Sequence, residues 1–155
     1  MTADRAAIHD LFAEYGAHLD ALRYDDWLGL FAAECSYYVM PRENHERGLP
    51  AGLIYCDTRA VLEDRIRALQ EANKYNIHSD RHLIGLPRLV RQEGEAFLVE
   101  APFAVYQTEQ EGDTRLFATG LYRARLQATE APLKIREQLV LLDTFAVPSL
   151  LATPL

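Results

Sequence analysis

The sequence predicts an α+β fold in which a curved, mainly antiparallel sheet wraps over a layer of N-terminal helices. Helical periodicity is confined to the first half of the chain, whereas long strand-like segments follow one another in the second half. Helices followed by a run of strands are typical of α+β domains. A length of 155 residues is enough to bury one sizeable core, so residues 1–155 are expected to form a single domain.

Two helices are predicted before residue 35. Apolar residues spaced by three and four predict an amphipathic helix over residues 4–21. A short second helix is expected to start after Tyr24, with Asp25 as its cap. Its expected buried face consists of Trp27, Leu28 and Phe31.

A third helix is predicted to run from a cap at Asp57 or Thr58 to about Ala72. An outer ion pair between Glu63 and Arg67 is expected, because residues four apart face each other on a helix. The expected inner stripe is Val61, Leu62, Ile66 and Leu69.

One strand is predicted early, over residues 36–40, and Pro41 ends it. The loop that follows, through Pro50, is expected to be polar and irregular. Turns are expected at 111–113 and 130–132, and bends at Gly85 and Gly120, because strands of this length curve. The four later strands are predicted at 81–90, 96–110, 114–127 and 133–143.

Composition argues against several classes of protein. A net charge of −7 without a block of Lys or Arg disfavours binding to nucleic acid or to an anionic membrane. No apolar run approaches the roughly 20 residues that span a bilayer, and the first residues lack the apolar run of a signal peptide, so a cytoplasmic protein is expected. Cys35 and Cys56 form no CxxC motif, and we expect both to be free, buried thiols.

Titratable side chains gather in two segments, the loop after Pro41 and the segment 75–90, yet they form no complete metal or nucleophile motif. His78 and His82 are four residues apart, a spacing that converges on a metal only on a helix, and their segment is strand-like. A Rieske cluster needs two pairs of Cys and His ligands, and neither cysteine starts such a pair. The sequence thus indicates a scaffold or subunit.

Two further hypotheses remain open. Asp20 and His82 could form an acid–base dyad at the floor of a pocket, with Tyr37 or Tyr38 polarising a substrate oxygen. In the plainer alternative, Asp20 is a solvated or locally paired group near the end of a helix.

The apolar tail, residues 147–155, is expected to pack on the domain or on a neighbouring chain.

Several segments occur in a characteristic order. They read LDALRYDDWLGLF (19–31), YYVMPREN (37–44), GLPAG (48–52), YCDTRAVLEDRIRAL (55–69), RHLIGLPRL (81–89) and FATGLYR (117–123). With the tail, they resemble the small (beta) subunits of Rieske non-haem iron aromatic-ring-hydroxylating oxygenases. The polar loop and the segment before residue 82 look most like the salicylate, anthranilate and terephthalate branch.

The resemblance implies a cone fold, similar to scytalone dehydratase, ketosteroid isomerase and nuclear transport factor two. It implies a non-catalytic subunit that holds no cofactor or metal itself. The partner would be a large (alpha) subunit that carries a Rieske [2Fe-2S] cluster and a mononuclear Fe(II), in a complex of three large and three small chains that acts on an aromatic carboxylate. The candidate interface or pocket-bracing residues are Arg42, Glu43, His45, Glu46, Arg81 and His82.

Two alternatives to a subunit role concern the cone itself. The first is a stand-alone lyase or isomerase that uses Asp20, Tyr38 and His82. Stand-alone cone enzymes commonly place a catalytic Asp four residues before a Trp, but Arg23 stands four before Trp27, which weakens this hypothesis. The second is a ligand-binding or dimerisation cone without chemistry.

Overall fold

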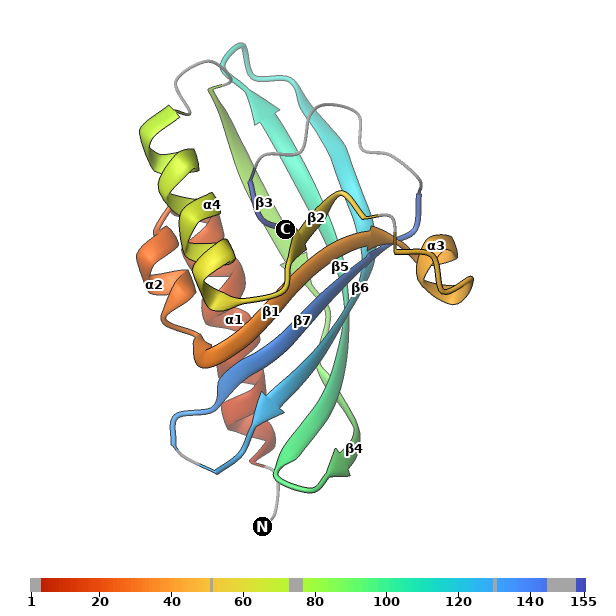
Figure 1. Ribbon diagram of the computed structural model, residues 1–155. Coiled ribbons are helices and arrows are strands. Elements are labelled where there is room, and N and C mark those ends of the chain that lie inside the picture. The colour runs from red at the N-terminus through yellow and green to blue at the C-terminus, as the bar shows by residue number, and fades with distance from the viewer. Residues whose placement is uncertain (1–3, 51, 73–76, 130, 145–152) are drawn as a thin grey trace.

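The computed structural model describes residues 4–50, 52–72, 77–129, 131–144 and 153–155. Within these ranges a seven-stranded sheet has the order β2-β1-β7-β6-β5-β3, and β4 pairs with the other end of β5 (Figure 1). Only β1 and β7 run parallel. The predicted α+β class with a mainly antiparallel sheet is therefore confirmed. The elements are α1 (Arg5–Asp20), α2 (Tyr24–Leu28), β1 (Phe31–Pro41), α3 (Arg42–Glu46), β2 (Ile54–Cys56), α4 (Arg59–Ala72), β3 (His78–Ile84), β4 (Arg88–Glu93), β5 (Ala96–Glu109), β6 (Thr114–Gln127) and β7 (Lys134–Leu142).

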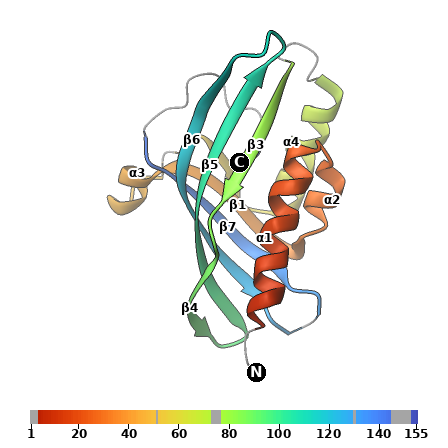
Figure 2. The ribbon, with the colours of Figure 1, turned by 180° about the vertical axis from the view of Figure 1, so that it is seen from behind.

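Three helices form a layer on one side of the sheet, and α3 lies apart from them at the far end of β1 (Figures 1 and 2). Helix α1 matches the prediction. Asp4 caps it by accepting a hydrogen bond from the Ala6 amide at 3.0 Å, and its apolar stripe is buried. The helix packs along β3, which brings the end of α1 close to the middle of that strand.

The segment after α1 differs from the prediction at both of its elements. Arg23, not Asp25, occupies the N-cap of α2, and Asp25 lies in the first turn. Phe31 is buried but belongs to β1, which begins five residues before the predicted strand. A five-residue helix is too short to repeat the helical period, so sequence spacing could not separate its end from the strand.

The polar loop was predicted to be irregular, but residues 42–46 form α3. Ion pairs stabilise this single turn, with Glu43 2.5 Å from Arg47 and Arg42 4.0 Å from Glu46. Strand β2 was also not predicted, because it has three residues and depends on pairing with β1.

Helix α4 follows Thr58, whose hydroxyl accepts from the Val61 amide at 3.3 Å, as one of the two predicted caps. Val61 itself is 42% exposed, so its placement in the inner stripe was wrong, since it lies about 100° around the helix from Leu62. The predicted Glu63–Arg67 pair is replaced by Arg59–Glu63 at 2.7 Å and Arg67–Asp64 at 3.1 Å.

The predicted strand 81–90 is two strands, β3 and β4, which pair with different parts of β5. Gly85 lies in the break, as expected for a bend, and a Cβ there would lie 2.6 Å from Pro102 Cγ. At Gly120 a Cβ would collide with the Leu141 carbonyl oxygen, so glycine permits a close approach of β6 to β7. The bulge itself is at Phe117, between the β5 partners Val105 and Tyr106.

The remaining strands and the hairpin turn match the prediction to within one residue. Gly112 has φ 97°, which suits the turn between β5 and β6. Of the second predicted turn, Glu130 lies outside the described residues. Cys35 and Cys56 are buried and free, as predicted. No helix in the described ranges is long and apolar enough to cross a membrane.

Candidate functional site

Asp20 and His82 meet where the end of α1 packs on β3. His82 Nδ1 lies 2.7 Å from Asp20 Oδ1, and the His82 amide donates to the same oxygen at 2.9 Å. Arg81 Nη1 donates to Asp20 Oδ2 at 3.3 Å. The structure therefore brings together two residues that are 62 positions apart, and of the two expectations for Asp20 it favours a paired group.

The rest of the hypothetical dyad site is not assembled around this pair. The His82 side chain is 1% exposed, and its Nε2 has no hydrogen-bond partner among the described residues. Tyr38 lies on the opposite face of the sheet, and Tyr37 points into the core. Asp20, Tyr38 and His82 do not form one site here. The geometry instead suits a brace in which a carboxylate ties α1 to β3.

A second polar chain continues along the inner face of the sheet from β3 to β6. Asp80 Oδ1 lies 3.4 Å from His78 Nε2 and accepts from Gln107 Nε2 at 3.4 Å, and Arg115 donates to Gln107 at 3.2 Å. Thus His78 and His82 contact different carboxylates. No three His, Cys, Asp or Glu side chains in the described ranges converge as a metal site requires, so these residues do not fit an iron centre.

Aromatic side chains fill the interior between the helices and the sheet. Trp27 packs edge-on against Tyr15 and Tyr37, with ring centroids 5.6 and 5.4 Å apart. Burial raises the pKa of the Tyr15 and Tyr37 hydroxyls, so both remain neutral donors. The prediction that the tail packs on the domain holds for its described end, because Leu155 is 1% exposed within this core.

The outer face of the sheet carries a separate apolar cluster, which we call the outer cluster. Tyr38 packs against Tyr55 with ring centroids 4.7 Å apart, and Tyr55 is 59% exposed. The cluster lies on β1, β6 and β7 and has no helix above it (Figures 1 and 2). Its members are Tyr38, Met40, Leu121, Leu139 and Leu141.

Charged side chains continue the outer face across β4, β5 and β6. Glu100 accepts from Arg88 at 2.8 Å and from Arg123 at 3.0 Å. Arg123 Nη1 also lies 3.5 Å from His45 Nε2, which joins α3 to this charged row. Arg125 pairs with Glu93 in the same way. The outer face therefore has two parts, the apolar outer cluster and the row of paired charges.

The six candidate interface residues occupy two places rather than one. Arg42, Glu43, His45 and Glu46 lie together on α3, where Arg42 pairs with Asp143 at 3.2 Å. Arg81 and His82 lie on β3, at the opposite edge of the sheet from β2. Arg81 reaches solvent, but His82 is enclosed and can only brace its surroundings.

Sequence reasoning missed two further features. One is Arg59, whose guanidinium donates to the carbonyl oxygens of Phe31, Ala32 and Leu28 at 2.9, 3.0 and 3.3 Å and so ties α4 to the start of β1. An Arg at the first position of a helix gives no signal of such contacts.

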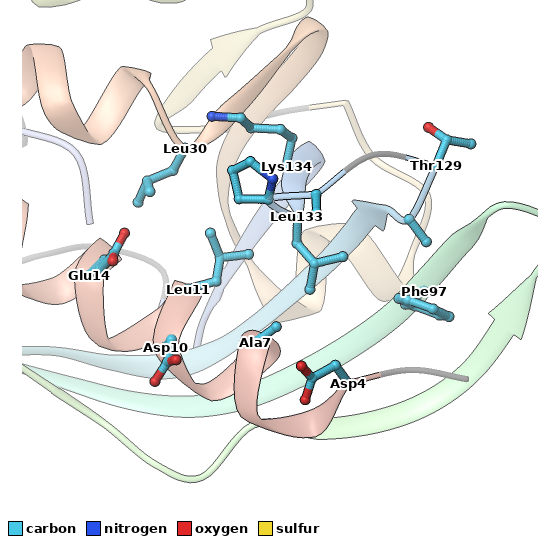
Figure 3. A pocket seen from close by; sticks show the side chains of 13 residues that line it. Asp4, Ala7, Asp10, Leu11, Glu14, Leu30, Phe97, Thr129, Leu133 and Lys134 are labelled. Atoms are coloured by element: carbon cyan, nitrogen blue, oxygen red, sulfur yellow. The ribbon is translucent and has the colours of Figure 1, made fainter. Parts of the chain in front are cut away.

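The other missed feature is a cleft of about 520 Å³ between the first turns of α1 and the β6–β7 connection (Figure 3). Its apolar floor includes Leu11, Phe97 and Leu133, and the carboxylates of Asp10 and Glu14 lie on its rim. Among the described residues no histidine lines it, so they supply no imidazole base there.

The fold and these surfaces define the chain as a cone-fold protein with a filled interior and an outer sheet face that lies away from the layer of three helices. A solved structure of a protein assigned as a scytalone dehydratase from Novosphingobium aromaticivorans shares this fold at a TM-score of 0.71 and 12% identity, covering 96% of this chain and 89% of that one. The predicted cone fold is confirmed.

The family model "Ring hydroxylating beta subunit" matches residues 16–149, and the chain belongs to this family. It is 35% identical to a beta subunit of the terephthalate 1,2-dioxygenase terminal oxygenase component from Comamonas sp, covering 92% of this chain and 93% of the relative. It is 34% identical to the anthranilate 1,2-dioxygenase small subunit from Burkholderia cepacia, covering 96% and 92%. A solved protein assigned as the beta subunit of an aromatic-ring-hydroxylating dioxygenase from Novosphingobium aromaticivorans superposes at a TM-score of 0.89, with 38% identity over 97% of this chain and 96% of that one.

The prediction of a ring-hydroxylating dioxygenase beta subunit, made from the ordered segments, is therefore confirmed. The chain is the small subunit of such an oxidoreductase, and a beta subunit implies a larger alpha partner.

Proposed function

We propose that this chain is the structural subunit of a complex with a Rieske large subunit, three copies of each, and that the [2Fe-2S] cluster and the Fe(II) both reside on the large subunit. The observation that carries the proposal is Tyr55, which is 59% exposed and packs on Tyr38 of the outer cluster, on the sheet face that also carries the charged row. Apolar surface left exposed in this way gains about 25 cal/mol for each Å² that a partner buries.

The proposed complex hydroxylates an aromatic carboxylate in aromatic catabolism, because the relatives are named for terephthalate and anthranilate. Substrate choice then lies with the large subunit, since the described residues of this chain bring no metal donors together. We further propose that the complex works in the cytoplasm, where the thiols of Cys35 and Cys56 stay reduced.

Assembly is tested by co-expressing the chain with a Rieske large subunit from the same genome and purifying through a tag on this chain. We expect a complex with equal numbers of both chains that contains iron, while the isolated chain contains none. Recovery of this chain alone, or a large subunit that assembles and turns over fully without it, would refute the structural role.

The part played by α3 is tested by reversing one charge. Arg42→Glu places a carboxylate beside Asp143 and Glu46 on the proposed partner-facing side. We expect at least about a tenfold weaker complex, because a like charge at an interface costs several kcal/mol. Arg67→Glu is the matched control, since Arg67 has a comparable exposure (64% against 55%) and a similar surface ion pair but lies on α4. Equal effects of the two variants would exclude α3 from the interface.

A further inference from the structure

The last residue of the sequence is held in the interior by its main chain rather than by its side chain alone. Tyr15 donates to the Leu155 carbonyl oxygen at 2.5 Å, and Tyr37 donates to the same oxygen at 2.9 Å. The Leu155 amide donates back to the Tyr37 hydroxyl at 2.8 Å. Two hydroxyls from separate elements, 140 and 118 residues away, thus converge on one oxygen.

The Leu155 oxygen is the hydrogen-bond acceptor for both of these tyrosine hydroxyls. Both are fully buried, and a buried hydroxyl without a partner costs about 1–3 kcal/mol. Burial also raises the pKa of each phenol, so neither can leave the arrangement by ionising near neutral pH. Phenylalanine at both positions would pack equally well and would require no hydrogen-bond acceptor between α1 and β1.

More unpartnered polar atoms surround the same place. Trp27 Nε1, the Tyr122 hydroxyl and the Gln138 amide are buried and have no hydrogen-bond partner within the described ranges. The Tyr122 ring lies 5.3 Å from that of Tyr15, and Gln138 is the β7 neighbour of Tyr37. The interior therefore combines apolar walls with an excess of polar groups, as in a site that takes a small ligand. In both views the end of the chain lies over the middle of the sheet (Figures 1 and 2).

We infer that Leu155 is a built-in ligand of the cone, occupying a binding site for a small branched compound with a hydrogen-bond-accepting oxygen at one end. Its side chain fills the apolar part of the site, and its carbonyl oxygen satisfies the Tyr15 and Tyr37 hydroxyls. The contact is autoinhibitory, because it excludes an external molecule while it persists. The inference concerns the chain by itself and does not depend on the proposed assembly.

The site is vacated by two independent variants. One lacks residues 153–155. The other is Leu155→Asp in the full chain, because an ionised carboxylate cannot remain in a position that is 1% exposed. The probe is 4-methylpentanamide, which is uncharged and carries the leucine side chain and a carbonyl oxygen. At 10 mM we expect it to raise the Tm of both variants by about 3 °C and to change the emission of Trp27, the one tryptophan of the chain.

Four controls define the site. The unaltered chain, and Leu86→Asp at a position that is 74% exposed, are expected to shift by less than about 1 °C. Acetamide, which lacks the branched chain, is expected to have no effect. Tyr37→Phe in the shortened chain is expected to weaken binding of the probe about three- to tenfold, because one hydrogen bond is lost.

The inference is overturned if folded, vacated variants show neither a Tm shift nor a fluorescence change, or if the unaltered chain binds the probe equally well. Failure of both variants to fold even with the probe present would overturn it too, because a ligand that fits the native site restores folding by mass action.

Discussion

Neighbouring residues Tyr37 and Tyr38 show how differently the two faces of one sheet are used. Tyr37 is fully buried, and its hydroxyl both donates to and accepts from Leu155. Tyr38 points the other way and packs at a tilt against the exposed ring of Tyr55. The inner face is buried beneath the helices, whereas the outer face carries the mostly buried outer cluster, the exposed Tyr55 ring and the charged row. The proposed association therefore uses the face opposite to the one that carries the aromatic core.

The division explains how a cone fold can serve as a subunit. In this structure the inner face is occupied by aromatic rings, by the end of the chain and by the Asp20–His82 brace. The same strands present the outer cluster and the charged row on their reverse side. Substitutions on the inner face should change the folding of the isolated chain, and those on the outer face should change assembly.

The largest expected effect is a loss of stability in alkali. Burial raises the pKa of Tyr15, Tyr37 and Tyr122 in the folded chain above the value of about 10 in the unfolded chain. Their contribution is fully present below pH 10 and is lost above it, because the unfolded state then binds fewer protons. Each tyrosine lowers the free energy of unfolding by roughly 1.4 kcal/mol per pH unit, so three remove about 4 kcal/mol by pH 11.

Urea unfolding between pH 8 and pH 11 measures this loss. Tyr37→Phe should reduce the alkaline slope by about one third, because one of the three buried phenols is removed. An unchanged slope in Tyr37→Phe would show that burial of this hydroxyl on the inner face does not cause the alkaline loss.

The next effect compares two leucines on β6. Leu126 is fully buried on the inner face, so Leu126→Ala should lower the free energy of unfolding by about 2–5 kcal/mol. Leu121→Ala removes the same atoms from the partly covered outer cluster and should cost roughly 1 kcal/mol. Chemical denaturation of the isolated chain gives both numbers. For assembly with the large subunit, Leu121→Ala should instead have the larger effect. A larger assembly defect in Leu126→Ala than in Leu121→Ala would contradict the comparison.

The brace at the end of α1 should have a smaller effect. Asp20→Asn keeps the shape of the side chain but removes its charge, which the Arg81 guanidinium and the His82 ring and amide contact. We expect a loss of about 2 kcal/mol, in the range for hydrogen bonds to a charged group. Thermal unfolding measures it, with Asp10→Asn earlier on the same helix as the control. Loss of an enzymatic turnover in the isolated chain, rather than of stability, would instead support the lyase hypothesis.

The smallest expected effect is in the charged row. Glu100→Gln removes the shared partner of Arg88 and Arg123 and should cost the isolated chain about 1 kcal/mol or less, because exposed guanidinium groups are well solvated. Asp64→Asn, which breaks the Arg67 pair on α4, is the control and should be close to zero. A loss of several kcal/mol in Glu100→Gln would mean that the outer face also contributes to folding.

Prediction from the sequence succeeded where a signal was long and local. The stripe of α1 and the alternation along β5 and β6 extend over fourteen or more residues, and their bounds were within one residue of the structure. It failed where an element was short or depended on a distant partner. Helix α3 has one turn, β2 has three residues, and the division of the segment 81–90 depends on Pro102 across the sheet.

The candidate site shows the same limit. His82 and Asp20 were recognisable as titratable groups, but only the packing of α1 on β3 brings them within 2.7 Å. The separation of Tyr37 from Tyr38 follows from the period of a strand, yet which of the two faces inward depends on the register of β1 with β7. The contacts of Tyr15 and Tyr37 with Leu155 span more than a hundred residues and leave no trace in local spacing.

The sequence by itself determined the α+β class, the long strands, the free cysteines and the family, because periodicity, composition and ordered segments are local or linear properties. Only the tertiary structure decided which face of the sheet is closed, where the Asp20–His82 brace forms and what the buried tyrosines bond to. The physical reason is that burial and hydrogen bonding in an interior depend on which distant parts of the chain come into contact. The packing of whole helices and strands determines those contacts.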